Sequence, residues 1–154
     1  MMAGERQSIK RHEAIAPLSR HHHHALALVL KIRKTETAAT KEQAEALRRE
    51  VQHFWQNGGQ QHFREEEEIL LPAYSRYASL DHEEIIGMLL DHVKIRAMVD
   101  SIQEETDDVL PLIRKFGDML EEHVRKEERV VFPMIEEALP EDVLRKLSPY
   151  FHEA

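Results

Sequence analysis

The stretches that decide the fold are residues 62–72, HFREEEEILLP, and residues 123–133, HVRKEERVVFP. Each has a histidine, a glutamate four residues later, a second glutamate beside it, an apolar pair and a proline. Because successive residues of an α-helix are turned by about 100°, positions four apart lie about 40° from each other on one face. If the two stretches are helical, each therefore presents a histidine and a glutamate side by side.

The rest of the sequence is typical of long helices. Ala, Leu, Glu, Lys, Arg and Gln dominate, glycine and proline are scarce, and alternating β-branched runs are absent. Short connections between the helical segments predict antiparallel neighbours, that is, an all-α, up-down-up-down four-helix bundle with a short C-terminal helix. The predicted helices run from behind Pro17 to about Lys34, from about Thr40 to Tyr77, from behind Asp81 to about Glu104, and from about Asp107 to Ala138.

Local signals mark the helix ends and one interruption. Ser19 is a candidate N-cap of the first helix. A kink is expected in the second helix near residues 57–59, Asn-Gly-Gly. Pro111 lies in the first turn of the fourth helix, and Pro140 ends that helix.

Length and charge limit the classes of function. We expect one domain over residues 1–154, with a bundle core at about 15–138 and a C-terminal tail at 140–152. The formal net charge of -8 argues against nucleic acid or an anionic membrane as a partner. No stretch approaches the roughly 18 to 20 apolar residues of a membrane span, and the N-terminus lacks the apolar segment of a signal peptide, so a cytoplasmic location is expected. Without cysteine there is no disulfide and no thiolate metal site.

Helix phase gives the glutamates of the first stretch different environments. Relative to His62, Glu66 lies inside the apolar stripe of its helix, Glu65 lies at the margin, and Glu67 and Glu68 are turned toward water. Glu66 is therefore the carboxylate expected in the core.

The second stretch repeats this arrangement with His123 and Glu127 inside the stripe and Glu128 turned away. A carboxylate in a core is unfavourable unless it is paired or binds a metal. A hydrogen-bonded core histidine is the alternative for any single position. Two such pairs on two inward faces favour metal binding.

The run LSRHHHHAL, residues 18–26, contains four consecutive histidines, which an expression tag would also explain. A tag normally lies at a terminus beside a linker, whereas this run is internal and enters an apolar segment. Helix phase turns His23 and His24 away from the core. His22 and His21 lie on opposite sides of the centre of the apolar stripe of this helix, so both are candidate ligands. His22 is favoured because it lies nearer to that centre.

His92 points inward from the third helix, and His82 near its start is expected in a cap or an exposed turn. Imidazole and carboxylate without sulfur suit iron, manganese or zinc, and the number of ligands suits two metals. Two six-coordinate metals have about twelve positions. Four histidines would fill four, two bridging carboxylates four more and one oxo or hydroxo bridge two, which leaves about two for a small molecule. The candidate ligands are His22, His62, Glu66, His92, His123 and Glu127.

Four segments, LSRHHHHAL, HFREEEEILLP, LLDHVKIR and HVRKEERVVFP, resemble in their order and separation those of the hemerythrin-like family, the bacterial proteins with an HHE cation-binding domain. The resemblance covers about residues 15–138. It implies a four-helix bundle around a non-haem centre of two oxo- or hydroxo-bridged irons that binds dioxygen reversibly or reacts with it. The matching positions are the six named above, with Glu66 and Glu127 as bridging carboxylates.

The sequence departs from the family in the third helix. The oxygen-carrying hemerythrins have two histidines there, four residues apart, whereas Met88 and Arg96 flank His92 at that spacing. The resemblance therefore implies that one metal has fewer protein ligands than in the oxygen carriers. That metal would be bound more weakly and exchange more readily. Arg96 has two interpretations, an ion pair with a site carboxylate or extension of its side chain to the bundle end.

The leading hypothesis is a metal-binding protein, not an enzyme, that binds or senses dioxygen or a related molecule such as nitric oxide. The alternatives are iron handling, a di-iron oxidase or peroxidase-like enzyme, and a structural bundle without metal. The assignment of faces predicts that His62→Ala or Glu127→Ala lowers the metal content sharply, whereas Glu67→Ala leaves it unchanged.

Overall fold

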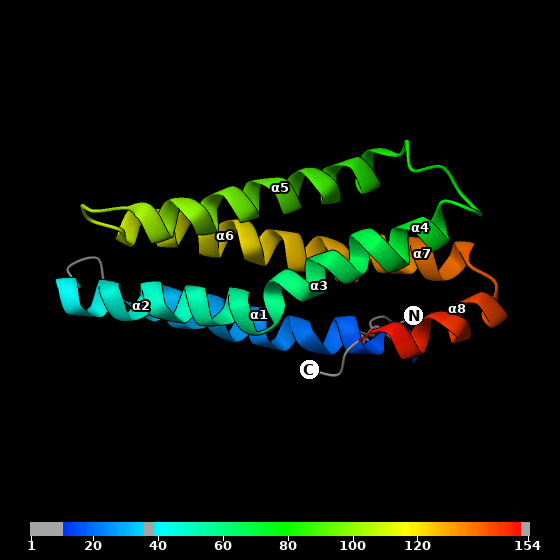
Figure 1. Ribbon diagram of the computed structural model, residues 1–154, viewed down its shortest axis with the longest axis horizontal. Coiled ribbons are helices and arrows are strands. Elements are labelled where there is room, and N and C mark those ends of the chain that lie inside the picture. Colours follow the sequence, from blue (N-terminus) through cyan, green and yellow to red (C-terminus); the bar gives the residue numbers. More distant parts are fainter. Residues whose placement is uncertain (1–10, 36–38, 152–154) are drawn as a thin grey trace, which may run out of the picture.

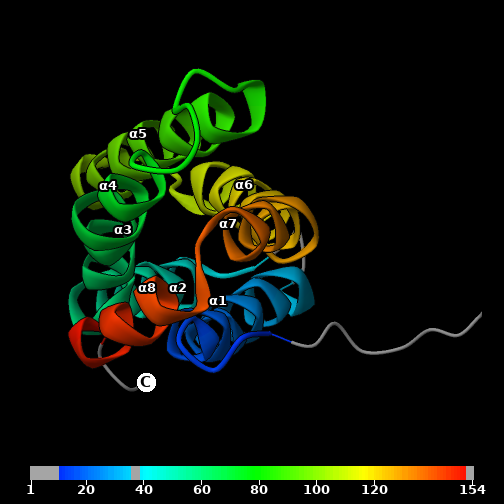
Figure 2. The same ribbon diagram turned by 90° about the vertical axis from the view of Figure 1, so that its right-hand side faces the viewer.

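The computed structural model describes residues 11–35 and 39–151, and within them it contains helices and no β-strand (Figure 1). The long helices lie side by side along the long axis of the molecule, and Figure 2 views them nearly end-on. In chain order the elements are α1 (Ala16–Lys34), α2 (Lys41–Phe54), η1 (Trp55–Gly59), α3 (Gln60–Glu65), η2 (Glu66–Leu70), α4 (Leu71–Tyr74), α5 (Glu83–Glu104), α6 (Leu110–Lys126), η3 (Glu127–Val131), α7 (Phe132–Ala138), α8 (Glu141–Leu147) and η4 (Ser148–Tyr150).

Four long helical stretches, the second of them kinked at residues 57–59, correspond to the four predicted helices. They are α1, the run from α2 to α4, α5, and the run from α6 to α7. The predicted tail is α8 followed by a single 3₁₀ turn, and residue 152 lies outside the described residues. None of the described helices is long and apolar enough to cross a membrane.

The helix starts differ from the prediction in two places. Ile15, not Ser19, is the N-cap of α1, and it makes no side-chain capping bond. Pro17 explains the shift, because proline suits the first turn of a helix and the helix therefore begins just before it. The last long helix begins at Leu110, whose N–H is accepted by the Asp108 side chain, and not at Asp107. Thr40 does cap α2 through a capping box with Gln43.

The predicted interruption at residues 57–59 is confirmed. Asn57 has φ -103° and ψ 26°, and Gly58 has φ 154°, so the helix bends between α2 and α3. A positive φ of this size is readily adopted only by glycine.

The apolar core is divided into two clusters. On α5, for example, Ile85 and Met88 belong to one cluster and Ile95 to the other, with buried His92 between them. The other long helices also place buried histidine or glutamate between the residues of the two clusters. Within the described residues, the core therefore contains a buried polar layer between the two apolar clusters.

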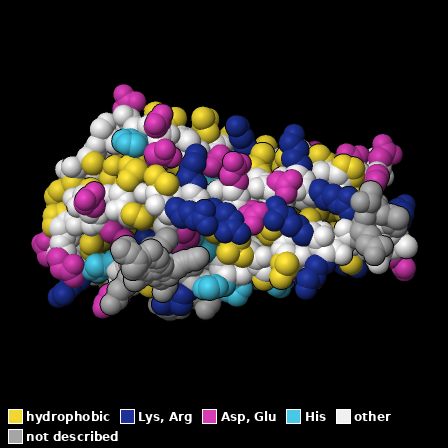
Figure 3. All heavy atoms as spheres, turned by 180° about the vertical axis from the view of Figure 1, so that it is seen from behind, with side chains coloured by type: hydrophobic (Ala, Val, Ile, Leu, Met, Phe, Trp, Pro, Cys, Tyr) yellow, Lys and Arg dark blue, Asp and Glu magenta, His cyan; other side chains and the backbone are white. Residues whose placement is uncertain are grey.

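On the surface seen in Figure 3, basic and acidic side chains are intermixed.

Candidate metal centre

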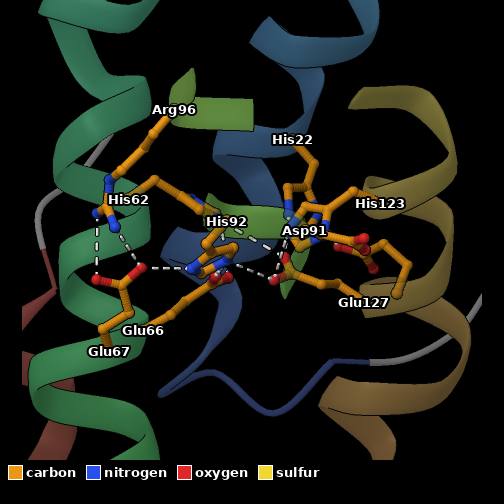
Figure 4. A network of polar contacts seen from close by, with 10 residues as sticks. His22, His62, Glu66, Glu67, Asp91, His92, Arg96, His123 and Glu127 are labelled. Atoms are coloured by element: carbon orange, nitrogen blue, oxygen red, sulfur yellow. Dashed lines mark hydrogen bonds and ion pairs between the residues drawn. The ribbon is translucent and has the colours of Figure 1, made fainter. Parts of the chain in front are cut away.

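All six candidate ligands meet in this layer (Figure 4). They form two groups in which the nitrogen and oxygen atoms lie within 4.8 Å of one another, and every member is buried. The groups share two glutamates. The first consists of His22, His62, Glu66 and Glu127, and the second of Glu66, His92, His123 and Glu127.

Each shared glutamate divides its two oxygens between the groups. Glu66 Oε2 lies 2.9 Å from Nε2 of His62, and its Oε1 lies 2.9 Å from Nε2 of His92. Glu127 Oε1 and Oε2 lie 2.9 and 3.0 Å from Nε2 of His22 and His123, respectively. This is the arrangement expected of two carboxylates that each bridge a pair of cations.

The short separations are poorly explained by hydrogen bonding. His22 Nε2 and Glu127 Oε1 form a hydrogen bond, but within the described residues Nε2 of His62, His92 and His123 forms none, and neither does either oxygen of Glu66. Buried polar atoms rarely remain without partners. Two ligands at right angles on one metal, with bonds of about 2.1 Å, lie about 3 Å apart. The spacing of these atoms therefore fits cations placed among them.

Both glutamates open a π-turn. Leu71 N–H donates to Glu66 O, and Phe132 N–H donates to Glu127 O, five residues apart in each case. The next residue is proline both times, Pro72 and Pro133, which cannot donate a backbone hydrogen bond and disturbs the α-helical pattern ahead of it. Such single π-turns are frequent at functional sites.

His92 is held in place by a carboxylate that helix phase assigned to solvent. Its Nδ1–H donates to Glu67 Oε2 at 2.6 Å, and Arg96 donates to both oxygens of Glu67 at 3.0 and 3.1 Å. The prediction that Glu67 faces water was therefore wrong, because its side chain reaches across to α5. Arg96 forms an ion pair with this supporting glutamate, and its guanidinium also lies 5.8 Å from the Phe63 ring centroid.

The second motif repeats this support. Nδ1–H of His22 donates to Glu128 Oε2 at 2.6 Å, and Glu128 also accepts from Ser19 at 2.6 Å and Arg11 at 3.0 Å. Thus the second glutamate of each motif holds a histidine on a neighbouring helix. The adjacent glutamate that both motifs share was the signal that sequence reasoning did not use.

His123 has a similar partner outside the motifs, since its Nδ1–H donates to Asp91 Oδ2 at 3.1 Å. Such carboxylate partners fix the tautomer and orient the other ring nitrogen toward a metal. His62 is the exception, because its buried Nδ1 has no hydrogen bond among the described residues.

The histidine run divides between core and surface. His22 belongs to the first group, whereas His21 is buried beside His62, with the ring centroids 5.0 Å apart, and joins neither group. His23 and His24 are exposed, as predicted. Helix phase favoured His22 without excluding His21, and the structure places Nε2 of His22, but no atom of His21, in a group of ligand atoms.

The remaining expectations for α5 have mixed outcomes. His82 is the N-cap of α5, and its Nδ1 accepts from Glu84 N–H. Met88 is buried in an apolar cluster. The four histidines divide equally between the two groups, so the structure does not leave one group with fewer histidines.

Charge complementarity dominates the electrostatics of the layer. Burial lowers the pKa of His62, but the charges of Glu66 and Glu127 outweigh it and raise the pKa to about 10. The same balance of burial against carboxylates raises the pKa of His92 to about 11 and of His123 to about 9. Without metal, protons on these rings therefore supply the positive charge that cations would otherwise provide.

The carboxylates shift in the opposite direction. Burial alone would raise the pKa of Glu127, but the neighbouring histidines, His123 foremost, hold it well below its ordinary value. Burial is likewise outweighed at Glu128, whose pKa is lowered to about 2 by His22 and Ser19. Glu127 and Glu128 are thus ionised beside the histidines.

Comparison with known proteins identifies one family. The model of the family described as "Hemerythrin HHE cation binding domain" matches residues 13–136, which include all six candidate ligands. No curated protein and no solved structure matches the chain.

Proposed function

This chain belongs to the hemerythrin HHE cation-binding domain family, and from that premise we propose that it binds two iron ions and takes up or senses a small molecule such as dioxygen or nitric oxide. The observation that carries the proposal is the division of the Glu66 and Glu127 oxygens between two histidine pairs. The proposal includes the up-down-up-down topology, which is supported by the alternating directions of the long helices in Figure 1.

The protein's own residues would act in three ways. The histidine pairs would hold one cation each and the two glutamates would contribute ligands to both, while the carboxylates hydrogen-bonded to His22, His92 and His123 keep Nε2 of these rings turned inward. The apolar clusters on both sides of the layer exclude water. Bound iron would supply open coordination positions and electrons for a small ligand.

Proton balance is part of this role. The histidines carry protons in the metal-free state because of their raised pKa values, and metal ligands must be deprotonated. Metal binding should therefore release protons from these rings to solvent.

The test is metal analysis of untagged protein, followed by visible spectra through cycles of deoxygenation and air. A charge-transfer band that returns in every cycle supports reversible binding, whereas a band that disappears only with substrate turnover supports the enzyme alternative. No bound transition metal, together with no loss of stability on chelation, would refute both and leave a structural bundle.

A further inference from the structure

His21 is buried beside the candidate centre without being one of its ligands. Its ring stacks on His62 with 5.0 Å between centroids and lies 5.9 Å from the Phe54 ring. Only 5% of the residue is exposed, and neither group of ligand atoms includes it. Its burial therefore calls for another role.

The bulge in the second long helix is shaped around this ring. A Cβ atom on Gly58 would lie 2.5 Å from His21 Nε2, closer than real side chains approach, and Gly58 also has the positive φ of 154°. Two independent features thus require glycine at the point where the backbone passes His21. The bulge and the buried histidine form one structural unit.

This unit forms part of the wall of a small cavity beside the centre. The cavity has a volume of ≈ 10 Å³ and is lined by His22, His62 and His123, with His21 and Gly59 among the other lining residues. The remaining lining is apolar. This volume is near the lower limit for one water-sized molecule. Apolar atoms of the lining residues form nearly all of the cavity surface, which disfavours charged molecules.

The His21 ring is close both to an exposed residue and to a candidate ligand. Its centroid lies 5.4 Å from that of exposed His24 and 5.0 Å from that of buried His62. We propose that His21 is a specificity-determining residue, whose ring closes the cavity and restricts access to the metals to uncharged diatomic molecules. This inference rests on the proposed function.

The test compares His21→Ala, which opens the wall, with His21→Phe, which keeps a ring, and with His23→Ala as an exposed control. Nitric oxide and tert-butyl isocyanide are mixed with the reduced, iron-loaded proteins. We expect His21→Ala to bind nitric oxide at least about tenfold faster, the factor that a barrier lower by about 1.4 kcal/mol gives, and to be the one variant that takes up the isocyanide. His21→Phe and His23→Ala should behave like the unmodified protein.

A further variant, Gly58→Ala, and a measurement that needs no bound iron, xenon binding in crystals, test the same inference. Gly58→Ala should push the His21 ring toward the cavity and slow the binding of nitric oxide. Crystals of the metal-free proteins under xenon pressure should contain a xenon atom in the cavity of His21→Ala and none in the unmodified protein.

Loss of iron from His21→Ala would overturn the inference, because His21 would then be a ligand. Unchanged rates together with an empty cavity under xenon would also overturn it. If the unmodified protein takes up no iron, the proposed function fails, while the xenon experiment still decides whether His21 closes the cavity.

Discussion

The two halves of the candidate centre contain the same ligand types but are held differently. In one half, Glu67 and Asp91 accept hydrogen bonds from Nδ1–H of His92 and His123. Phe63 also stacks on His92, with 3.9 Å between centroids and 4° between planes. Both rings of this half are therefore held in orientation at Nδ1, the ring nitrogen that faces away from the candidate metal positions.

In the other half, among the residues that the structure describes, only His22 has such a carboxylate partner, Glu128. His62 has a ring contact with His21 and a cavity beside it instead. Because supporting hydrogen bonds raise metal affinity, we expect that a metal between His92 and His123 would be held tightly and that one beside His62 would be more accessible and more labile.

The largest expected effect is the loss of metal binding in both halves of the candidate centre at once. Glu66→Gln or Glu127→Gln should abolish binding of both metals, because each side chain gives one oxygen to each histidine pair. Metal content per chain checks this, with Glu68→Gln, an exposed position in the same acidic run, as the control. A variant that keeps one tightly bound metal would show that its glutamate serves one half alone.

The stability of the metal-free protein and its affinity for metal should depend on pH in opposite directions. The folded-state pKa values of His62, His92 and His123, about 10, 11 and 9, exceed the ordinary value of 6.5. Their contribution to stability is thus complete below about pH 6.5 and is lost as the pH rises through 9 to 11. Metal affinity should change in the opposite sense, because the ligands must lose their protons.

Urea unfolding of both forms at about pH 6, 8 and 10 measures the two trends. A metal-free protein whose stability rises with pH over this range would contradict the charge arrangement described for the layer.

Each carboxylate that accepts a hydrogen bond from Nδ1–H of a candidate ligand should influence the metal affinity of one half alone. Glu67→Gln should weaken the metal between His92 and His123 by about 10–100-fold and leave the other half almost unchanged. Chelator competition on unmodified protein should remove metal in two steps, and this variant should bring the steps together. An effect no larger than that of Glu68→Gln would restore the view of Glu67 as a solvent residue.

Arg96 should have the smallest effect. Its ion pair with Glu67 is partly exposed, at 34% for the arginine side chain, so water screens it. Arg96→Met should therefore lower metal affinity by only about a factor of two to five, within the range measured for exposed pairs. Arg64→Met, which breaks the exposed pair with Glu68, is the matched control. A loss as large as that of Glu67→Gln would mean that Arg96 fixes the carboxylate.

Helix periodicity was sufficient to predict which glutamate of each motif is fully buried. Glu66 and Glu127 could be separated from their neighbours because 100° per residue sorts a helix into faces, and both are fully buried. The count of coordination positions suggested two bridging carboxylates, and the family resemblance assigned this role to Glu66 and Glu127, which the division of their oxygens in the structure supports.

Other features depend on distances between helices, which no single-helix pattern contains. Glu67 and Glu128 were assigned to water because they lie off the apolar stripe, yet their side chains reach histidines on neighbouring helices. The burial of His21 depends on the backbone bulge at Gly58, a local deviation that periodicity does not describe.

The most direct test of the account is a crystal structure of the iron-loaded protein with anomalous diffraction data at the iron edge. The account predicts two iron peaks per chain, one between His22 and His62 and one between His92 and His123, with both glutamates contacting both peaks. A single peak, or two peaks that share no glutamate, would contradict it.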